Sequence, residues 1–314
     1  MNYYRFTQRY IGLILLSRNI CEVREIMSRK NAEILLAAVV LARSASFLFS
    51  KILLDTMEPF NLMGIRFLLA GGILLLIFSR RFAGISRRTL CKGAILGFCF
   101  FLVMTFELFG LETVSSSSAA LLEGTAIIFV PIFESLLSKT MPSKRSALSA
   151  ALTFFGVALL TSGGGGFSLG VGELSCLAAA VTYAAGMIVT DRLTDGEDSI
   201  VLGTLQVTFM GIFGMAASLL TESPSLPASP ESWGAMLFLV IICSSFGFAM
   251  QPVAQKYTTS ERTAVLGALN PMGAAVLGMI FLHETIGLWG IAGAGLIVAG
   301  LLFQNVQKQQ SLGH

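Results

Sequence analysis

Apolar runs of membrane length follow one another along most of this chain, with short polar breaks between them. A run of about 20 apolar residues matches the hydrocarbon thickness of a bilayer. In lipid each run must be helical, because every backbone N–H and C=O has to be satisfied internally. The pattern predicts an all-α membrane protein with ten transmembrane helices, at residues 32–54, 59–78, 93–111, 116–137, 145–162, 170–190, 199–221, 233–254, 263–282 and 286–305.

Composition supports this class. Of 314 residues, 54% are hydrophobic and only 12% are charged, and the mean hydropathy is +0.78. A soluble domain carries about 25% charged residues. Five cysteines suggest no disulfide framework, two histidines leave little material for a metal site, and no phosphate-binding loop of the Walker type is present. We therefore expect no catalytic residue, no cofactor and no metal ion, and no nucleic-acid partner.

The basic residues that lie between the predicted spans occur only in alternate loops, such as the segment 80–92 and the segment 139–145. The remaining loops contain six acidic residues and no Lys or Arg: Asp55, Glu58, Glu112, Glu222, Glu231 and Glu284. By the positive-inside rule, both termini are predicted to be cytoplasmic, in the cytoplasmic membrane of a prokaryotic cell.

The two ends of the chain are predicted to be cytoplasmic tails, a basic one at residues 1–31 and a short one at 306–314. The apolar run Tyr10–Leu16 is too short to span a bilayer. It also lacks a following cleavage site, which disfavours a signal peptide. Whether translation begins at Met1 or at Met27 stays open.

The two halves of the chain show weak internal similarity. An offset of 140 pairs Arg66 with Gln206, and an offset of 144 pairs further positions: Glu107 with Gln251, Ile127 with Pro271, Thr140 with Glu284, and Gly156 with Gly300. We predict two five-helix repeats at residues 32–162 and 170–305, joined by an external glycine-rich linker at 163–169. An odd number of spans gives the repeats opposite topology, an architecture typical of secondary transporters.

Three motifs resemble the EamA-type branch of the drug/metabolite transporter superfamily: Leu62–Leu74, Gln251–Tyr257, and the set Ala264, Asn270–Pro271, Glu284 and Gly300. The resemblance implies ten helices in two inverted repeats, and export or exchange of small metabolites, often amino acids or related compounds. The chain departs from the family at Arg43, where an aromatic is usual, and at Thr140, where an acidic residue usually closes the fourth span.

Five ionisable residues stand well inside the predicted spans: Arg43, Arg66, Glu107, Glu123 and Glu134. Such residues usually face a cavity or one another. At about 1.5 Å per residue, Arg66 and Glu123 lie about 10 Å below the outer ends of their spans. Three or four of the five can therefore meet in one polar cluster.

Glu123 is the central candidate, as a carboxylate that binds a cationic group or a proton. The alternative is a structural ion pair with Arg43 or Arg66. Arg43 shares a helical face with Ser46, and either anchors a substrate carboxylate or serves as a counter-ion to a glutamate. The predicted substrate-binding residues are Arg43, Ser46, Glu107, Glu123, Tyr183, Gln251 and Asn270. The predicted structural or coupling residues are Arg66, Gln206, Pro131 and Pro271.

These observations predict a secondary transporter that exports a small metabolite by alternating access, coupled to protons. A membrane-embedded enzyme is an alternative, but His283 is the only non-terminal histidine and no HExxH or GxSxG motif occurs. A channel is the other alternative. The expected partners are the metabolite, H⁺ and the lipid bilayer. The glycines of the last span predict a packing surface, either within the fold or in a homodimer.

Overall fold

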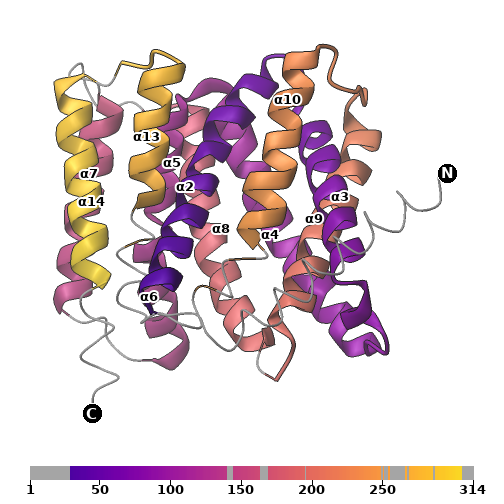
Figure 1. Ribbon diagram of the computed structural model, residues 1–314. Coiled ribbons are helices and arrows are strands. Elements are labelled where there is room, and N and C mark those ends of the chain that lie inside the picture. The colour runs from indigo at the N-terminus through magenta and orange to yellow at the C-terminus, as the bar shows by residue number, and fades with distance from the viewer. Residues whose placement is uncertain are drawn as a thin grey trace.

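The computed structural model describes residues 29–139, 144–162, 169–194, 196–248, 269–285 and 287–305, and the single residues 250, 254 and 266. These residues form a helical bundle without a β-strand (Figure 1). The helices are α2 (Arg29–Leu54), α3 (Pro59–Ile77), η1 (Ser79–Phe82), α4 (Arg87–Thr113), α5 (Ser116–Gly124), α6 (Ala126–Ser138), α7 (Lys144–Ser162), α8 (Val171–Thr194), α9 (Ser199–Thr221), α10 (Pro230–Phe238), η2 (Leu239–Phe246), α13 (Leu269–Phe281) and α14 (Leu288–Asn305).

The helical class predicted from the sequence is confirmed, whereas the count of ten spans stays a prediction. Within the described residues, six segments are long and apolar enough to cross a membrane: 30–54, 59–77, 87–113, 116–137, 171–194 and 199–221. Four shorter apolar helices accompany them, at 147–161, 230–246, 269–281 and 288–300. Residues 263–265 and 267–268 of the predicted ninth span lie outside the described residues.

The predicted fourth span, 116–137, is not one continuous helix. It is divided at Thr125 into α5 and α6, before Pro131 is reached. The Thr125 hydroxyl donates to the Leu122 carbonyl at 2.6 Å, and the adjacent Gly124 is a poor helix former. Pro131 lies inside α6 and removes one backbone donor there. The break leaves Glu123 near the end of a short helix.

The predicted eighth span also departs from regular geometry. After α10 it continues as the π-helix η2, and the Ser245 hydroxyl donates to the Val240 carbonyl at 2.8 Å. η2 packs against α2 and α3. π-Helical segments often occur at functional sites, and hydrophobic periodicity contains no sign of this one.

α3 and α9 run antiparallel in close contact through glycines. A methyl carbon placed on Gly71 would lie 2.9 Å from the Cα of Thr208, and one placed on Gly211 would lie 3.0 Å from the Cα of Leu68. Gly211 lies 140 residues after Gly71, and Leu68 lies 140 residues before Thr208. The second contact is therefore the repeat counterpart of the first, with the two helices exchanged. The two helices are therefore related by a local two-fold axis perpendicular to their length.

α7 and α14 form a second pair of this kind, at one edge of the bundle in Figure 1. A methyl carbon on Gly156 would lie 2.8 Å from the Gly293 carbonyl oxygen, and one on Gly300 would lie 3.0 Å from the Ser149 carbonyl oxygen. Here the offset of 144 exchanges the two contacts. Two helix pairs thus repeat the two-fold relation predicted from the sequence.

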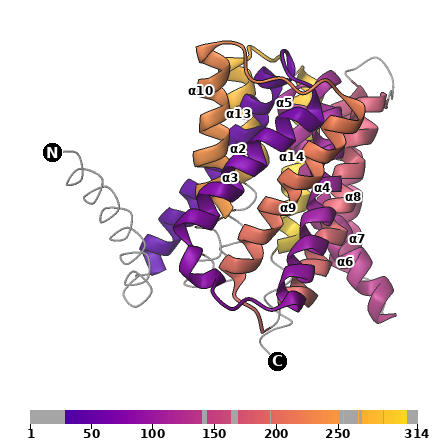
Figure 2. The same ribbon diagram turned by 90° about the vertical axis from the view of Figure 1, so that its right-hand side faces the viewer.

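The core is shared by both halves of the chain. Buried side chains from α2, α3, α4, α5, α9 and η2 join one apolar cluster, including Leu62, Phe67, Leu108 and Met210. The outward faces of the helices seen in Figures 1 and 2 also carry large apolar side chains, such as Leu220 at 85% exposed. Apolar surface on this scale is unusual for a soluble monomer and suits contact with lipid.

Candidate functional site

Arg66 on α3 is a charged residue buried in the interior, at 4% exposed. Its guanidinium donates three hydrogen bonds to serine hydroxyls: Nε to Ser244 at 2.9 Å, Nη1 to Ser50 at 3.3 Å and Nη2 to Ser46 at 2.9 Å. Ser46 and Ser50 lie on α2, and Ser244 lies on the π-helix η2. This geometry supports a structural role for Arg66, which ties three elements together.

The serines of α2 were expected to line a cavity beside Arg43, but the structure turns their hydroxyls toward Arg66. Arg43 is half-buried, and its guanidinium carbon lies 5.3 Å from the ring centroid of Phe248. Ser244, which the sequence analysis missed, reaches Arg66 from a position far along the chain. The only sign of Ser244 in the sequence is that it is a polar residue within an apolar run, and this is a weak signal of a buried partner.

Glu107 on α4 and Glu123 on α5 are brought together. Their carboxyl groups are near enough to act on each other. Arg43 and Arg66 are both near enough for their positive charge to act on Glu107, and Arg43 also acts on Glu123. These four residues, which the sequence predicted as members of one polar cluster, therefore lie in the same part of the structure.

Two buried acceptor oxygens near this cluster have no hydrogen-bond partner among the described residues, Glu123 Oε2 and Asn270 Oδ1. α5 and α13 pack against each other, and Gly278 of α13 faces Ser116 and Ser117 of α5. Counting from that contact at about 1.5 Å per residue, Glu123 and Asn270 lie at similar depths, about 10–12 Å away. Both helices thus carry an unsatisfied acceptor at the end that points into the bundle.

The remaining predicted residues occupy varied places. Tyr183 on α8 packs edge-on against Phe100, with ring centroids 5.6 Å apart. Gln206 is buried on α9, and Pro271 is buried in the first turn of α13. Gln251 lies outside the described residues.

Lys51, a charged residue within the first predicted span, has an evident structural role. Its ammonium lies at the end of α4, where it donates to the carbonyls of Glu112 at 3.2 Å and Val114 at 3.1 Å, and to that of Leu111. A cation at a helix C-terminus satisfies free carbonyls and complements the helix dipole. Lys51 therefore fixes the turn between α4 and α5 onto α2.

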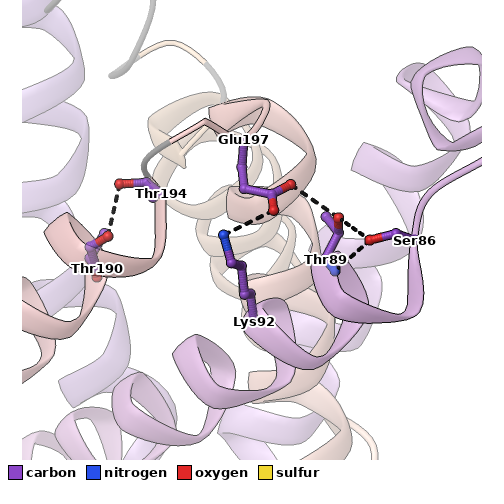
Figure 3. A network of polar contacts seen from close by, with 6 residues as sticks. All are labelled: Ser86, Thr89, Lys92, Thr190, Thr194 and Glu197. Carbon is purple, nitrogen blue, oxygen red and sulfur yellow. Dashed lines mark hydrogen bonds and ion pairs between the residues drawn. The ribbon is translucent and has the colours of Figure 1, made fainter.

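A second polar network lies at the opposite end of the bundle (Figure 3). Glu197, in the turn between α8 and α9, pairs with Lys92 at 2.9 Å and accepts from the Thr89 hydroxyl at 3.0 Å. Beside it Arg81 pairs with Asp198 at 2.7 Å. Hydrogen bonds from Lys92 and Thr89 hold the pKa of the Glu197 carboxyl below its usual value. This network joins the two halves of the chain.

Comparisons with known proteins agree with the fold. The profile of the EamA-like transporter family matches residues 30–162 and again residues 170–306. A solved crystal structure superposes on this chain with a TM-score of 0.64 and 17% sequence identity. The matched region covers 90% of this chain and 99% of the chain in the crystal structure. That level of identity supports a shared fold alone.

Two relatives illustrate the level of sequence similarity. An uncharacterized transporter of Archaeoglobus fulgidus is 26% identical over 88% of this chain and 98% of its own length. A protein of Chlamydia muridarum, named S-adenosylmethionine/S-adenosylhomocysteine transporter, is 28% identical over 82% of this chain and 86% of its own. With the family profile matched in both halves, the chain belongs to the EamA-like transporter family of integral membrane proteins.

Proposed function

We propose that this protein is a secondary transporter that moves an amino acid or an amino-acid derivative across the cytoplasmic membrane by alternating access. The observation that carries the proposal is the cluster of Glu107, Glu123, Arg43 and Arg66 inside the bundle. Charges are costly within a bilayer, and those retained there usually mark a substrate or proton pathway.

The architecture that we propose is ten spans in two inverted repeats, at 32–162 and 170–305. The contacts made by Gly71 and by its repeat counterpart Gly211 support it, and so do those made by Gly156 and its counterpart Gly300. In each case a two-fold axis relates two antiparallel helices, which is what opposite topology produces. The charge bias of the loops supports cytoplasmic termini. In such transporters the site lies near the membrane midplane, between the repeats.

The substrate class follows from the groups that the site offers. Glu123 Oε2 and Asn270 Oδ1 are buried acceptors that need donors, and an ammonium group supplies up to three. Arg43 offers a positive charge for a carboxylate. The name of the Chlamydia muridarum relative supports this class, because S-adenosylmethionine carries both an α-amino and an α-carboxylate group.

Proton coupling is supported by the two facing carboxyl groups. Two buried carboxyl groups that act on each other would repel if both were ionised, so we infer that one of them carries a proton. A substrate ammonium that approaches Glu123 would displace this proton, so that binding of the two cations is mutually exclusive. Exchange of this kind would drive export of the metabolite against entry of H⁺.

The test is a counterflow screen in proteoliposomes across amino acids, S-adenosylmethionine, sugars, nucleosides and cationic drugs, repeated with an imposed pH gradient. We expect counterflow of an amino-acid-like compound, and acceleration of net uptake by the gradient. Glu123→Gln should remove the response to the gradient while the protein stays folded. Glu134→Gln, the same chemical change on an exposed position of α6, is the matched control and should keep it.

Two results would overturn the proposal. Electrical conduction through single proteins at rates far above transporter turnover would indicate a channel. Chemical conversion of a compound in the screen, without movement of any, would indicate an embedded enzyme. Unchanged pH-dependent transport in Glu123→Gln would remove Glu123 from the coupling mechanism.

A further inference from the structure

The Glu284 carboxylate, in the segment that follows α13, binds the first turn of α5. Its oxygens accept from the backbone N–H of Ser116 at 2.6 Å and of Ser117 at 3.0 Å, and from the Ser117 hydroxyl. The next two amides of α5 are bound by Ser115, whose hydroxyl accepts from Ser118 at 3.2 Å and whose carbonyl accepts from Ala119 at 2.9 Å. Glu284 and the Ser115 hydroxyl thus bind three of the donors that a helix N-terminus leaves free, and the Ala119 bond is the first one within the helix.

The same place is closely packed. A methyl carbon on Gly278 of α13 would overlap the Glu284 carboxylate and the hydroxyls of Ser116 and Ser117, so glycine leaves the room that these side chains occupy. The Ser117 hydroxyl also lies 3.2 Å from the Ala275 carbonyl. We call Glu284, Ser116, Ser117 and Gly278 the Glu284 clamp. It joins α5, from the first half of the chain, to α13, from the second.

The clamp lies at one end of the two helices that carry the unsatisfied acceptors of the proposed site. α5 begins at the clamp and α13 ends beside it, and Glu123 and Asn270 lie farther along them. α5 is short, because it stops at the break beside Thr125. A short helix held at one end by hydrogen bonds can move there without breaking a long packed interface.

The closed arrangement is not fully satisfied. The Ser116 hydroxyl is buried within the clamp, and has no hydrogen-bond partner among the described residues. A buried hydroxyl without a partner is unfavourable relative to a hydrated one. This residual penalty in the closed form is a feature expected of a contact that opens and closes.

We propose that the Glu284 clamp is the latch that closes the Glu123 site at this end of the bundle, and that α5 and α13 separate there when the site opens. The inference rests on the proposed alternating access. Glu284 is then a positioning residue, which acts by holding α5 against α13 and makes no contact with the substrate. By the charge bias of the loops, this end faces away from the cytoplasm.

A second carboxylate provides a matched comparison. Glu222 accepts from the backbone N–H of Phe60 at 2.8 Å and of Asn61 at 2.7 Å, so it also binds the first turn of a helix in the other half. That helix, α3, is packed along its length against α9 by the glycine contacts described above. Loss of the Glu222 contact should therefore leave the α3–α9 pair closed.

The first experiment measures access to the site with a membrane-impermeant maleimide. In a chain with its five cysteines replaced, Ala120→Cys places a thiol on α5, one turn from Glu123, at a position that is 1% exposed. Labelling is measured in whole cells and in inverted vesicles. Glu284→Gln should raise the labelling rate about tenfold or more from one face of the membrane only, as expected when charge-assisted hydrogen bonds are lost from one of two states.

Glu222→Gln in the same Ala120→Cys chain is the control and should leave the rate unchanged. The latch is refuted if Glu284→Gln leaves labelling unchanged from both faces, or if Glu222→Gln raises it equally. Because labelling requires no substrate, this result is independent of the counterflow screen. If the protein transports a substrate but Glu284→Gln does not change labelling, the latch is refuted and the proposed function stands. If Glu284→Gln changes labelling but no substrate is transported, the proposed function is refuted.

The second experiment locks the clamp. A methyl carbon on Gly278 would lie 2.6 Å from the Ser116 hydroxyl oxygen, which suits a disulfide between Ser116→Cys and Gly278→Cys. Oxidation of this pair should protect the thiol introduced by Ala120→Cys from labelling, and reduction should restore its labelling. If the oxidised protein is labelled as fast as the reduced one, the clamp does not control access. Each single variant of the pair reports whether the protein folds with that substitution.

Discussion

Replacement of Arg66 by Lys tests whether this residue acts through its charge or through its shape. The guanidinium sends three donors in three directions, to Ser244, Ser50 and Ser46. Lysine keeps the charge but ends in a single nitrogen, which cannot reproduce the planar fork. In the described structure it would have to abandon at least one of the three hydroxyls, and the Nε partner Ser244 is the first to be lost.

The magnitude follows from the number of bonds lost. A hydrogen bond that involves a charged group contributes about 1.5–3 kcal/mol, and a buried hydroxyl left without a partner adds to the loss. We expect Arg66→Lys to lower the free energy of unfolding by about 2–4 kcal/mol. Ser244→Ala should account for about 1–3 kcal/mol of this, whereas Ser50→Ala, whose bond is longer at 3.3 Å, should have a smaller effect.

The assay is equilibrium unfolding in mixed micelles with increasing SDS, monitored by tryptophan fluorescence and circular dichroism. If Arg66 serves only as a counter-ion to Glu107, Arg66→Lys will unfold within about 0.5 kcal/mol of the wild type, the range of an ordinary surface substitution. That outcome would refute the reasoning from the serine fork. If Arg66→Lys lowers the free energy of unfolding but Ser244→Ala does not, the bond between Arg66 and Ser244 is not the one that stabilises the protein.

Two further predictions follow from other contacts. Gly71→Ala and Gly211→Ala should each destabilise the α3–α9 pair by about 1–3 kcal/mol through overpacking, while Gly72→Ala, where an added methyl meets nothing within 4 Å, should not; similar SDS midpoints for all three would contradict this. Because Lys92 and Thr89 hold the pKa of Glu197 below its usual value, the stabilisation from Glu197 should be complete above about pH 4.3 and lost as the pH falls toward the folded pKa. The difference in stability between wild type and Glu197→Gln should accordingly shrink in acid, and a difference that grows would refute it.

Hydropathy and charge were sufficient to predict the helical membrane class from the sequence. A bilayer makes the position of each apolar run and each basic loop physically decisive, so the helical class followed directly. The depth of an ionisable residue in its helix also follows from the rise per residue. For this reason the meeting of Arg66, Glu107 and Glu123 could be anticipated before any contact was known.

The partners of those residues could not be anticipated. Arg66 binds Ser244, and Glu284 binds Ser116, across sequence separations of 178 and 168 residues. A serine in an apolar run has the same local pattern whether it faces lipid, a neighbouring helix or a guanidinium. Glu284 was interpreted as a loop residue because its own surroundings are polar, and only the packing of α13 on α5 reveals what it binds.

Breaks in regular helix were equally hidden. The π-helix η2 and the division at Thr125 leave hydropathy unchanged, because both preserve an apolar surface of the same length. Pro131 was predicted to be a structural or coupling residue of the fourth span, yet α5 ends before it, at Gly124. A short-range competition between the Thr125 hydroxyl and the backbone decided the outcome, and periodicity cannot weigh such a competition.

The choice of partners for Arg66 bears on how the site can work. Its described hydrogen bonds all go to neutral hydroxyls, while its charge remains near enough to act on Glu107. A direct guanidinium–carboxylate bond would have fixed Glu107 in place and would have to break in each cycle. With the fork held by serines, the positive charge of Arg66 acts on Glu107 without binding it. In the transport cycle that we propose, Glu107 and Glu123 would exchange a proton for a substrate ammonium while Arg66 keeps α2, α3 and η2 together.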